Sequence, residues 1–99
     1  MTMKIKKNYH EKYAEFYNSK EWKELRAFKF ADAGGLCEQC LENGIVKIGK
    51  EVDHIKPIET HWHLRLVFAN LRLLCSDCHN AKHNRMSLLQ KFLSDWENV

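Results

Sequence analysis

Two pairs of cysteines constrain this chain more than any other feature. Cys37 and Cys40 form one C-x-x-C motif, and Cys75 and Cys78 form a second after 34 intervening residues. A chain of 99 residues is a single domain, and its hydrophobic core alone contributes little net stability. Four thiolates in two C-x-x-C pairs are the ligands and the spacing of a tetrahedral zinc site. The sequence therefore predicts that these four cysteines, called the zinc clasp below, staple the domain.

Disulfide bonds are the main alternative for the cysteines. The chain shows no signal-peptide pattern and no run of the roughly eighteen apolar residues needed to cross a bilayer. We therefore expect a soluble, cytoplasmic protein with no membrane partner, in a reducing compartment where thiols bind metals. A redox role is also disfavoured, because the strand of a βαβ unit that leads into a thioredoxin-type motif is missing.

The second cysteine pair runs directly into two histidines, His79 and His83. If this pair and both histidines bound one ion, Cys37 and Cys40 would be left as free thiols. Neighbouring residues of a helix point about 100° apart, so Cys78 and His79 cannot easily face the same ion. His79 and His83 are spaced i and i+4 and share a helical face. We interpret the segment as divided between two sites.

A carboxylate and a histidine in the segment VDHI provide partners for that second site. Asp53 and His54 lie on a predicted strand, whose alternation sends the two side chains to opposite faces. One of them could bind a metal while the other does chemistry beside it. A lone histidine on a strand is usually structural, but His54 occurs together with an acidic residue and two further histidines beside a zinc clasp. This grouping favours a catalytic site.

The remaining pattern predicts a mixed α and β domain. A helix is expected over residues 18–33, capped by Asn18 or Ser19 and ended by two glycines, with a buried face formed by Trp22, Leu25, Phe28 and Ala31. A hairpin of residues 45–48 and 52–55 should follow, and then a loop with a short helical turn. A helix should begin near Asp77.

The two ends of the chain have different sequence patterns. Residues 1–15 are expected to be a basic, partly mobile segment, and residues 16–99 a folded domain. Ser87 should cap a C-terminal amphipathic helix whose apolar residues are Leu88, Leu89, Phe92, Leu93 and Trp96.

Four segments together resemble the HNH endonucleases, most closely the small phage-type enzymes with a four-cysteine zinc. They are FYNSKEW, LCEQC, VDHIKPI and NLRLLCSDCHNAK, which follow one another from about Phe16 to Lys82 in the order and spacing of the family. The resemblance implies an α+β fold with a ββα-metal (His-Me finger) core, an N-terminal helix, a zinc-binding clasp of four cysteines and a C-terminal helix.

The resemblance also implies roles for individual residues. His54 matches the general base that takes a proton from the attacking water, and Asp53 matches a ligand of the catalytic metal. Asn70 matches the asparagine that holds the loop and orients the base through a hydrogen bond. His79 matches the final histidine of the motif, a metal ligand. His83 lies one turn later, where some HNH nucleases have a further ligand and many phage-type members do not.

Two kinds of metal site follow from these ligands. The four thiolates imply one structural Zn²⁺. The oxygen and nitrogen ligands imply one catalytic divalent metal, which could be Mg²⁺, Mn²⁺, Ni²⁺ or Zn²⁺. Arg72, Lys82 and Arg85 lie close to the motif residues in the sequence and are candidate contacts to DNA phosphates. Residues 1–30, with eight Lys or Arg against four Glu, could add a nonspecific contact to the DNA backbone.

The implied function is hydrolysis of phosphodiester bonds in double-stranded DNA, by nicking or cutting, in an enzyme encoded by a phage and active in its bacterial host. Small phage HNH proteins often work with terminase during DNA packaging, so terminase is a candidate partner. The alternative is a noncatalytic zinc-binding module that holds DNA or a protein. Such a module would not need Asp53, His54, Asn70 and His79 together.

Overall fold

The structure, a computed structural model, describes residues 9–85. Two antiparallel strands, β1 (Glu51–His54) and β2 (Leu71–Leu74), form a small sheet in which Glu51 lies opposite Leu74 and His54 opposite Leu71. The other elements are α1 (Tyr9–Tyr17), α2 (Lys20–Asp32), α3 (Glu38–Glu42), the 3₁₀ turns Trp62–Leu64 and Phe68–Asn70, and a helix over residues 76–85.

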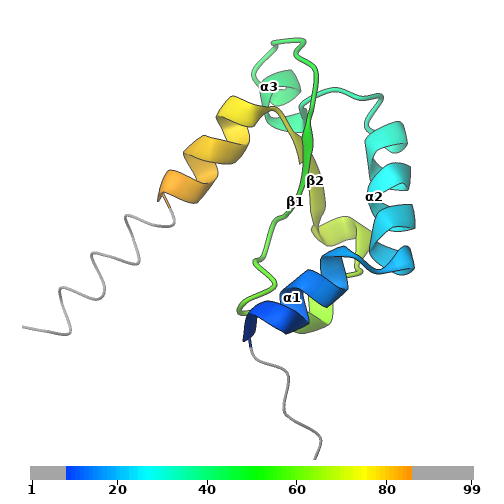
Figure 1. Cartoon of the computed structure of the whole chain (residues 1–99). Coiled ribbons are helices and arrows are strands. Elements are labelled where there is room, and N and C mark those ends of the chain that lie inside the picture. The colour runs from blue at the N-terminus through cyan, green and yellow to red at the C-terminus, as the bar shows by residue number, and fades with distance from the viewer. Residues whose placement is uncertain (1–8, 86–99) are drawn as a thin grey trace, which may run out of the picture.

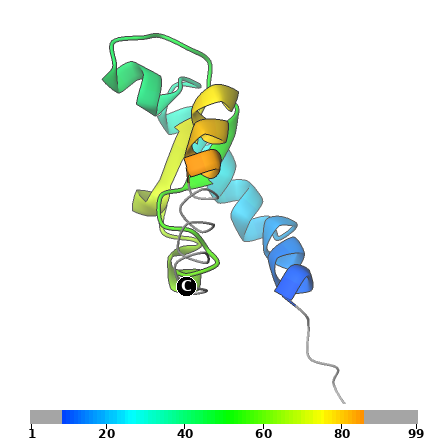
Figure 2. The ribbon, with the colours of Figure 1, turned by 90° about the vertical axis from the view of Figure 1, so that its left-hand side faces the viewer.

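The sheet lies between α2 on one face and helix 76–85 on the other, as both ribbon views show (Figures 1 and 2). The order of strand, strand and helix is the predicted ββα core, and the α+β fold class is confirmed. The predicted C-terminal helix lies outside the described residues. None of the helices between residues 9 and 85 is long and apolar enough to span a membrane.

Helix α2 begins and ends where the sequence predicts. The Ser19 hydroxyl caps it by accepting a hydrogen bond from the Trp22 backbone N–H at 3.2 Å. After its last turn the chain passes through Gly34 and Gly35, both with positive φ angles of 63° and 71°. Glycine adopts this left-handed conformation without steric cost, so the two glycines end the helix.

The predicted buried face of α2 is wrong beyond its first two residues. Trp22 and Leu25 do pack inward, but Phe28 is 61% exposed and Lys29 is buried instead. Each step of three residues falls back by about 60° around a helix, so Phe28 has turned away from Trp22 whereas Lys29 is almost aligned with it. Lys29 can be buried because it forms an ion pair with Glu38 at 3.0 Å.

Helix α1 is an element that the sequence reading did not predict. Its residues are mostly polar, and the side chain that anchors it is Phe16, which is 6% exposed. Phe16 packs against Trp22 and Trp62 with ring centroids 5.2 and 5.6 Å apart. One aromatic residue near the end of a polar stretch gives too weak a periodic signal for a helix to be predicted. The domain boundary between residues 15 and 16 stays a prediction, although α1 crosses that position.

The predicted hairpin of residues 45–48 with 52–55 is also wrong, because β1 pairs with β2. Ile45, Val46 and Ile48 are 54 to 74% exposed, and Ile48 forms only an isolated bridge to Leu36. The backbone of this segment bonds to the zinc-clasp loop instead: Cys37 N–H donates to the Lys47 carbonyl at 2.8 Å. Its short apolar run therefore belongs to a loop over the clasp.

The buried residues form two clusters, one mainly aromatic and one made mainly of cysteines. One cluster joins α1, α2, β2 and the segment between β1 and β2; its residues are Phe16, Trp22, Ile58 and Leu71. The second is made of Leu74 and the zinc clasp. Because β2 supplies Leu71 to the first cluster and Leu74 to the second, it connects the zinc clasp to the aromatic core.

Candidate active site and metal centres

The zinc clasp is formed by the starts of two helices. Cys37 precedes α3 and Cys75 precedes helix 76–85, and each sulfur accepts a hydrogen bond at 3.4 Å from the backbone N–H of the second cysteine of its pair. The four sulfurs lie within 4.8 Å of one another. Cys40 Sγ is 3.9 Å from Cys75 Sγ and 3.7 Å from Cys78 Sγ. A zinc ion with sulfurs at about 2.3 Å has tetrahedral edges of about 3.8 Å, so the four sulfurs fit zinc.

The thiols of the clasp differ in acidity. Burial raises the pKa of Cys37, but hydrogen bonds with the Cys40 and Cys75 backbone outweigh it and leave the pKa at about 6. Burial raises the pKa of Cys78 to about 12, with hydrogen bonds to the other thiols adding to the effect. Because a metal binds thiolates, metal uptake must displace the protons that such thiols retain near neutral pH.

A second cluster combines one carboxylate and two imidazoles. Asp53 Oδ1 lies 3.5 Å from His83 Nε2 and 4.0 Å from His79 Nδ1, and the three ligand atoms fall within 4.8 Å of one another. Within the described part of the chain, His79 Nδ1 is buried and has no hydrogen-bond partner. A buried ring nitrogen without a partner, facing a carboxylate, fits a divalent metal. His83 is 52% exposed and leaves the cluster open on one side.

His54 lies on the opposite side of β1, as strand alternation predicts. Its ring is 5% exposed and stacks on Trp22, with centroids 4.9 Å apart and planes at 23°. Its Nε2 is 2.9 Å from the Arg65 carbonyl oxygen. A carbonyl only accepts, so Nε2 carries the hydrogen, and Nδ1 is then the basic nitrogen of the neutral ring.

The side chain of Asn70 bonds to the backbone of the loop on both sides and not to the ring of His54. Its Oδ1 accepts a hydrogen bond from Lys56 N–H at 2.9 Å, and its Nδ2 donates to the carbonyls of Lys56 and Leu64 at 3.1 and 3.3 Å. The ring of His54 is held by Arg65 instead. Asn70 is therefore connected to the ring of His54 through the Leu64–Arg65 backbone and not by a direct hydrogen bond, and a backbone carbonyl has no sequence signature.

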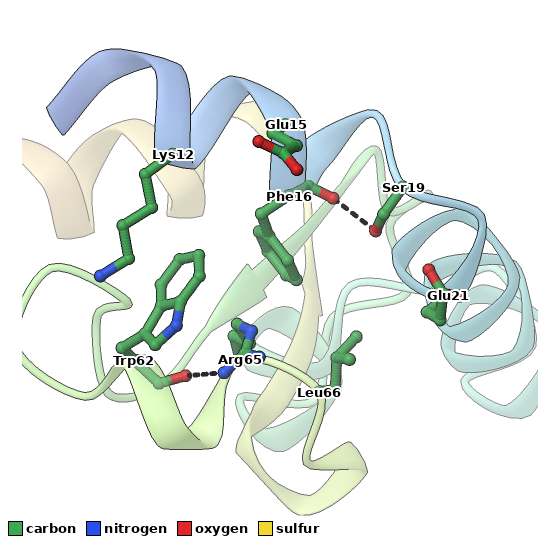
Figure 3. A pocket seen from close by; sticks show the side chains of 8 residues that line it. All are labelled: Lys12, Glu15, Phe16, Ser19, Glu21, Trp62, Arg65 and Leu66. Atoms are coloured by element: carbon green, nitrogen blue, oxygen red, sulfur yellow. Dashed lines mark hydrogen bonds between the residues drawn. The ribbon is translucent and has the colours of Figure 1, made fainter. Parts of the chain in front are cut away.

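The side chain of Arg65 secures the same turn. Its Nη1 donates to the Trp62 carbonyl at 3.0 Å, and its guanidinium lies 4.5 Å from the centre of the Trp62 ring. Lys12 of α1 also approaches that ring, at 4.1 Å. These side chains line a hollow of about 520 Å³ beside Phe16 (Figure 3). Helix α1 and the turn are thus held together around Trp62, next to the carbonyl that fixes His54.

Tyr17 is a further residue near the site, and it lies in the FYNSKEW segment. Its ring meets that of His54 edge-on at 6.4 Å. Burial raises the pKa of the Tyr17 phenol, and the carboxylates of Glu59 and Asp53 raise it further. The phenol therefore keeps its proton at neutral pH and is a hydrogen-bond donor near Asp53.

The three predicted phosphate contacts line a single hollow of about 650 Å³ between the sheet and helix 76–85. Two of the three cations already have partners: Arg72 pairs with Glu42 at 2.7 Å, and Lys82 pairs with Asp53 at 2.5 Å. Arg85 is exposed. The structure brings the predicted residues together but gives them different surroundings.

Comparisons with known proteins agree with this geometry. The HNH endonuclease family matches residues 37–85, the part that contains both metal clusters. The chain is 37% identical over 71 residues to the "Probable HNH endonuclease" of Lactococcus phage SK1, covering 68% of this chain and 73% of that protein.

A solved structure is also similar. The crystal structure of the HNH endonuclease of the deep-sea thermophilic bacteriophage GVE2, which contains a manganese ion, matches with a TM-score of 0.77 and 35% sequence identity. The match covers 79% of this chain and 85% of that one. The fold, the two ligand clusters and these relatives lead to one conclusion. The chain belongs to the HNH endonuclease family, metal-dependent hydrolases that cleave DNA.

Proposed function

We propose that this enzyme cleaves double-stranded DNA at a single site on β1, leaving 5′-phosphate and 3′-hydroxyl ends. The observation that supports this proposal most is that the consecutive residues Asp53 and His54 have side chains in two different environments. Asp53 faces the imidazoles of His79 and His83, whereas His54 is held by a carbonyl in one tautomer. The proposed metal ligand and the proposed base are thus neighbours in the chain.

His54 is the proposed general base. As a water oxygen attacks the phosphorus, its proton passes to Nδ1 of His54, and the bond from phosphorus to the 3′ oxygen breaks. A positioned base of this kind contributes about 10²- to 10⁴-fold in rate. Arg65 and Asn70 keep the ring in place, and stacking on Trp22 excludes water from one of its faces.

Asp53, His79 and His83 are the proposed ligands of the catalytic metal. A bound divalent ion would neutralise charge on the phosphoryl group and on the departing 3′ oxygen. One oxygen and two nitrogens accept Mg²⁺, Mn²⁺, Ni²⁺ or Zn²⁺, and Mn²⁺ is the ion found in the GVE2 structure. The clasp is proposed to hold one structural Zn²⁺.

Arg72 and Arg85 are proposed to meet the DNA backbone, because they line one hollow beside the proposed metal ligands; Lys82 lines the same hollow but its ammonium is directed at Asp53. The phage relatives support a phage origin and activity inside a bacterial host. An association with terminase stays a prediction from the family resemblance. Co-purification from infected cells would test it.

Relaxation of supercoiled plasmid tests the proposed function. With Mg²⁺, Mn²⁺ or Ni²⁺, open circles should appear first, because one site cuts one strand per encounter, and EDTA should stop the reaction. His54→Ala should lose at least about 100-fold in rate. His63→Ala is the matched control, since His63 is exposed on the loop and lies in neither metal cluster.

Two outcomes would contradict the proposal. Equal rates for His54→Ala and the native enzyme would remove His54 from the chemistry. DNA binding without relaxation in any metal would favour the noncatalytic zinc-binding module.

A further inference from the structure

Helix 76–85 brings a cation to β1 as well as two imidazoles. The Lys82 ammonium lies 2.5 Å from Asp53 Oδ2 and 2.5 Å from the His54 carbonyl oxygen. Lys82 and His83 follow His79 by three and four residues, so they flank it on one face of the helix. The side chains of Lys82 and Asp53 are only 23% and 11% exposed, which limits screening by water.

The two oxygens of Asp53 face different partners. Oδ1 faces the nitrogens of His79 and His83, whereas Oδ2 is taken by Lys82. A carboxylate can bind a metal through one oxygen or through both. With Oδ2 occupied by an ammonium group, only Oδ1 remains directed at the imidazoles.

We propose that Lys82 is a resident cation that shares Asp53 with the catalytic metal. In the metal-free enzyme it neutralises and orients the carboxylate; with a metal at Oδ1 it keeps Oδ2. Lys82 is thus a positioning residue that limits Asp53 to one-oxygen coordination. This inference rests on the metal site assigned under the proposed function.

Two consequences of opposite sign follow from the charges. An ammonium group and a divalent cation on one carboxylate repel each other, so Lys82 weakens metal binding. The same ammonium reduces the negative charge that Asp53 offers to the metal, so more of the ion's charge is available to the phosphoryl group. Lys82 therefore lowers the affinity of the site for the metal and raises the rate of cleavage once the metal is bound.

This role differs from that of an ordinary phosphate contact. A lysine whose main partner is DNA should affect DNA affinity and its salt dependence, and it should have no effect on metal binding without DNA. Two of the three N–H donors of Lys82 are already directed at β1. Metal affinity measured without DNA therefore separates the two roles.

The experiment compares the native, zinc-loaded full chain with three variants. Lys82→Met removes the charge and keeps most of the stem, and Lys82→Arg keeps the charge. Lys23→Met makes the same charge change at an exposed position of α2. Mn²⁺ is titrated by calorimetry without DNA, the thermal unfolding of each protein is followed with and without Mn²⁺, and visible absorption of the Co²⁺-loaded proteins reports on coordination.

Lys82→Met should bind Mn²⁺ about 10-fold more tightly than the native chain and gain more thermal stability from it, since its buried carboxylate lacks a cation until the metal arrives. Its Co²⁺ spectrum should change as the second oxygen of Asp53 becomes a ligand. Lys82→Arg should stay within about threefold of the native affinity, and Lys23→Met should equal it. At saturating Mn²⁺, Lys82→Met should cleave about 10-fold more slowly.

Mn²⁺ affinity in Lys82→Met that is equal to or weaker than native would overturn the inference. So would a defect limited to DNA affinity, which would make Lys82 a phosphate contact. Native enzyme that binds Mn²⁺ but does not relax plasmid would end the proposed function while leaving the comparison of affinities valid. Absence of Mn²⁺ binding in both proteins would overturn the metal site and the inference together.

Discussion

His54 shows how one residue can be both buried and chemically specific. Aromatic rings from two helices enclose it, and the Arg65 carbonyl fixes which nitrogen carries the hydrogen. The sequence identifies His54 and its neighbour Asp53 through their pairing and the family motif. It does not identify Arg65, because the hydrogen bond is made by a backbone atom that every residue possesses.

Asn70→Ala tests whether the loop bonds of Asn70 support His54, the proposed base. The substitution removes three hydrogen bonds and leaves the N–H and the carbonyl of Lys56 without partners, whereas the Leu64 carbonyl keeps the Val67 N–H at 3.2 Å. We expect the free energy of unfolding to fall by about 2 to 3 kcal/mol and the rate of cleavage to fall with it. Mn²⁺ affinity should be unchanged, since the bonds of Asn70 reach none of the metal ligands. Urea unfolding and calorimetry measure the two effects.

The control for Asn70 is Asn80→Ala, because Asn80 is exposed on helix 76–85. It should change stability by no more than about 0.5 kcal/mol. Native stability in Asn70→Ala would contradict the role given to these hydrogen bonds, and weakened Mn²⁺ binding would show that the loop also supports the metal ligands.

The helix that starts after Cys75 is the element that joins the two candidate metal sites. Cys75 and Cys78 fix its first turn in the clasp, and the following turns carry His79, Lys82 and His83. Its start was predicted to within one residue, since cysteine spacing and helical periodicity agree there. The pairing of β1 with β2 was not predicted, because short apolar runs on loops and on strands have similar sequence patterns.

Proton release on zinc binding tests the clasp. In the zinc-free chain at pH 7, Cys37 with a pKa of about 6 is mostly ionised, whereas Cys78 with a pKa of about 12 is protonated. The hydrogen bond with Cys37 raises the pKa of Cys40, so that thiol also keeps its proton, whereas the hydrogen bond from the Cys78 backbone lowers the pKa of Cys75. Zinc should therefore displace about two to three protons. Zinc affinity should fall as the pH falls, and more steeply below pH 6, where Cys37 also takes up a proton. Calorimetry in buffers of different ionisation enthalpy counts these protons.

A count of about four protons at pH 7 would show that Cys37 is not acidic before zinc arrives. Independence of zinc affinity from pH would argue against thiolate coordination altogether. Nuclease activity should follow zinc content in the same samples, because His79 is placed by the residue before it.

At the scale of the whole molecule, one buried ion pair connects elements that are distant in sequence. Lys29 of α2 binds Glu38 Oε1 at 3.0 Å, and Glu38 Oε2 accepts from Leu73 N–H of β2 at 2.6 Å. The first turn of α3, which carries the first cysteine pair of the zinc clasp, is thereby tied to α2 and to β2. The order of elements was predictable from the motifs, but this connection was not, since Lys29 was not among the residues of the predicted buried face.

Glu38→Gln tests this connection. It leaves the Lys29 ammonium buried without its counter-ion, so the free energy of unfolding should fall by about 3 kcal/mol in urea titrations of the zinc-loaded chain. Glu24→Gln is the matched control, because Glu24 forms an exposed pair with Lys20 at 3.8 Å and should cost no more than about 0.5 kcal/mol. Equal losses of unfolding free energy in the two variants would show that the pair of Lys29 and Glu38 stabilises the fold no more than an exposed pair does.

The direct succession of Cys78 and His79 limits how the length of this protein can change. One residue inserted between them would rotate the rest of the helix by about 100° and shift it by about 1.5 Å, turning His79, Lys82 and His83 away from Asp53 together. An insertion among the exposed residues 43–46, between the end of α3 and the Lys47 carbonyl that bonds to Cys37, would lengthen only a loop over the clasp. Insertions and deletions in homologous chains should therefore gather in that loop and be absent between residues 75 and 83.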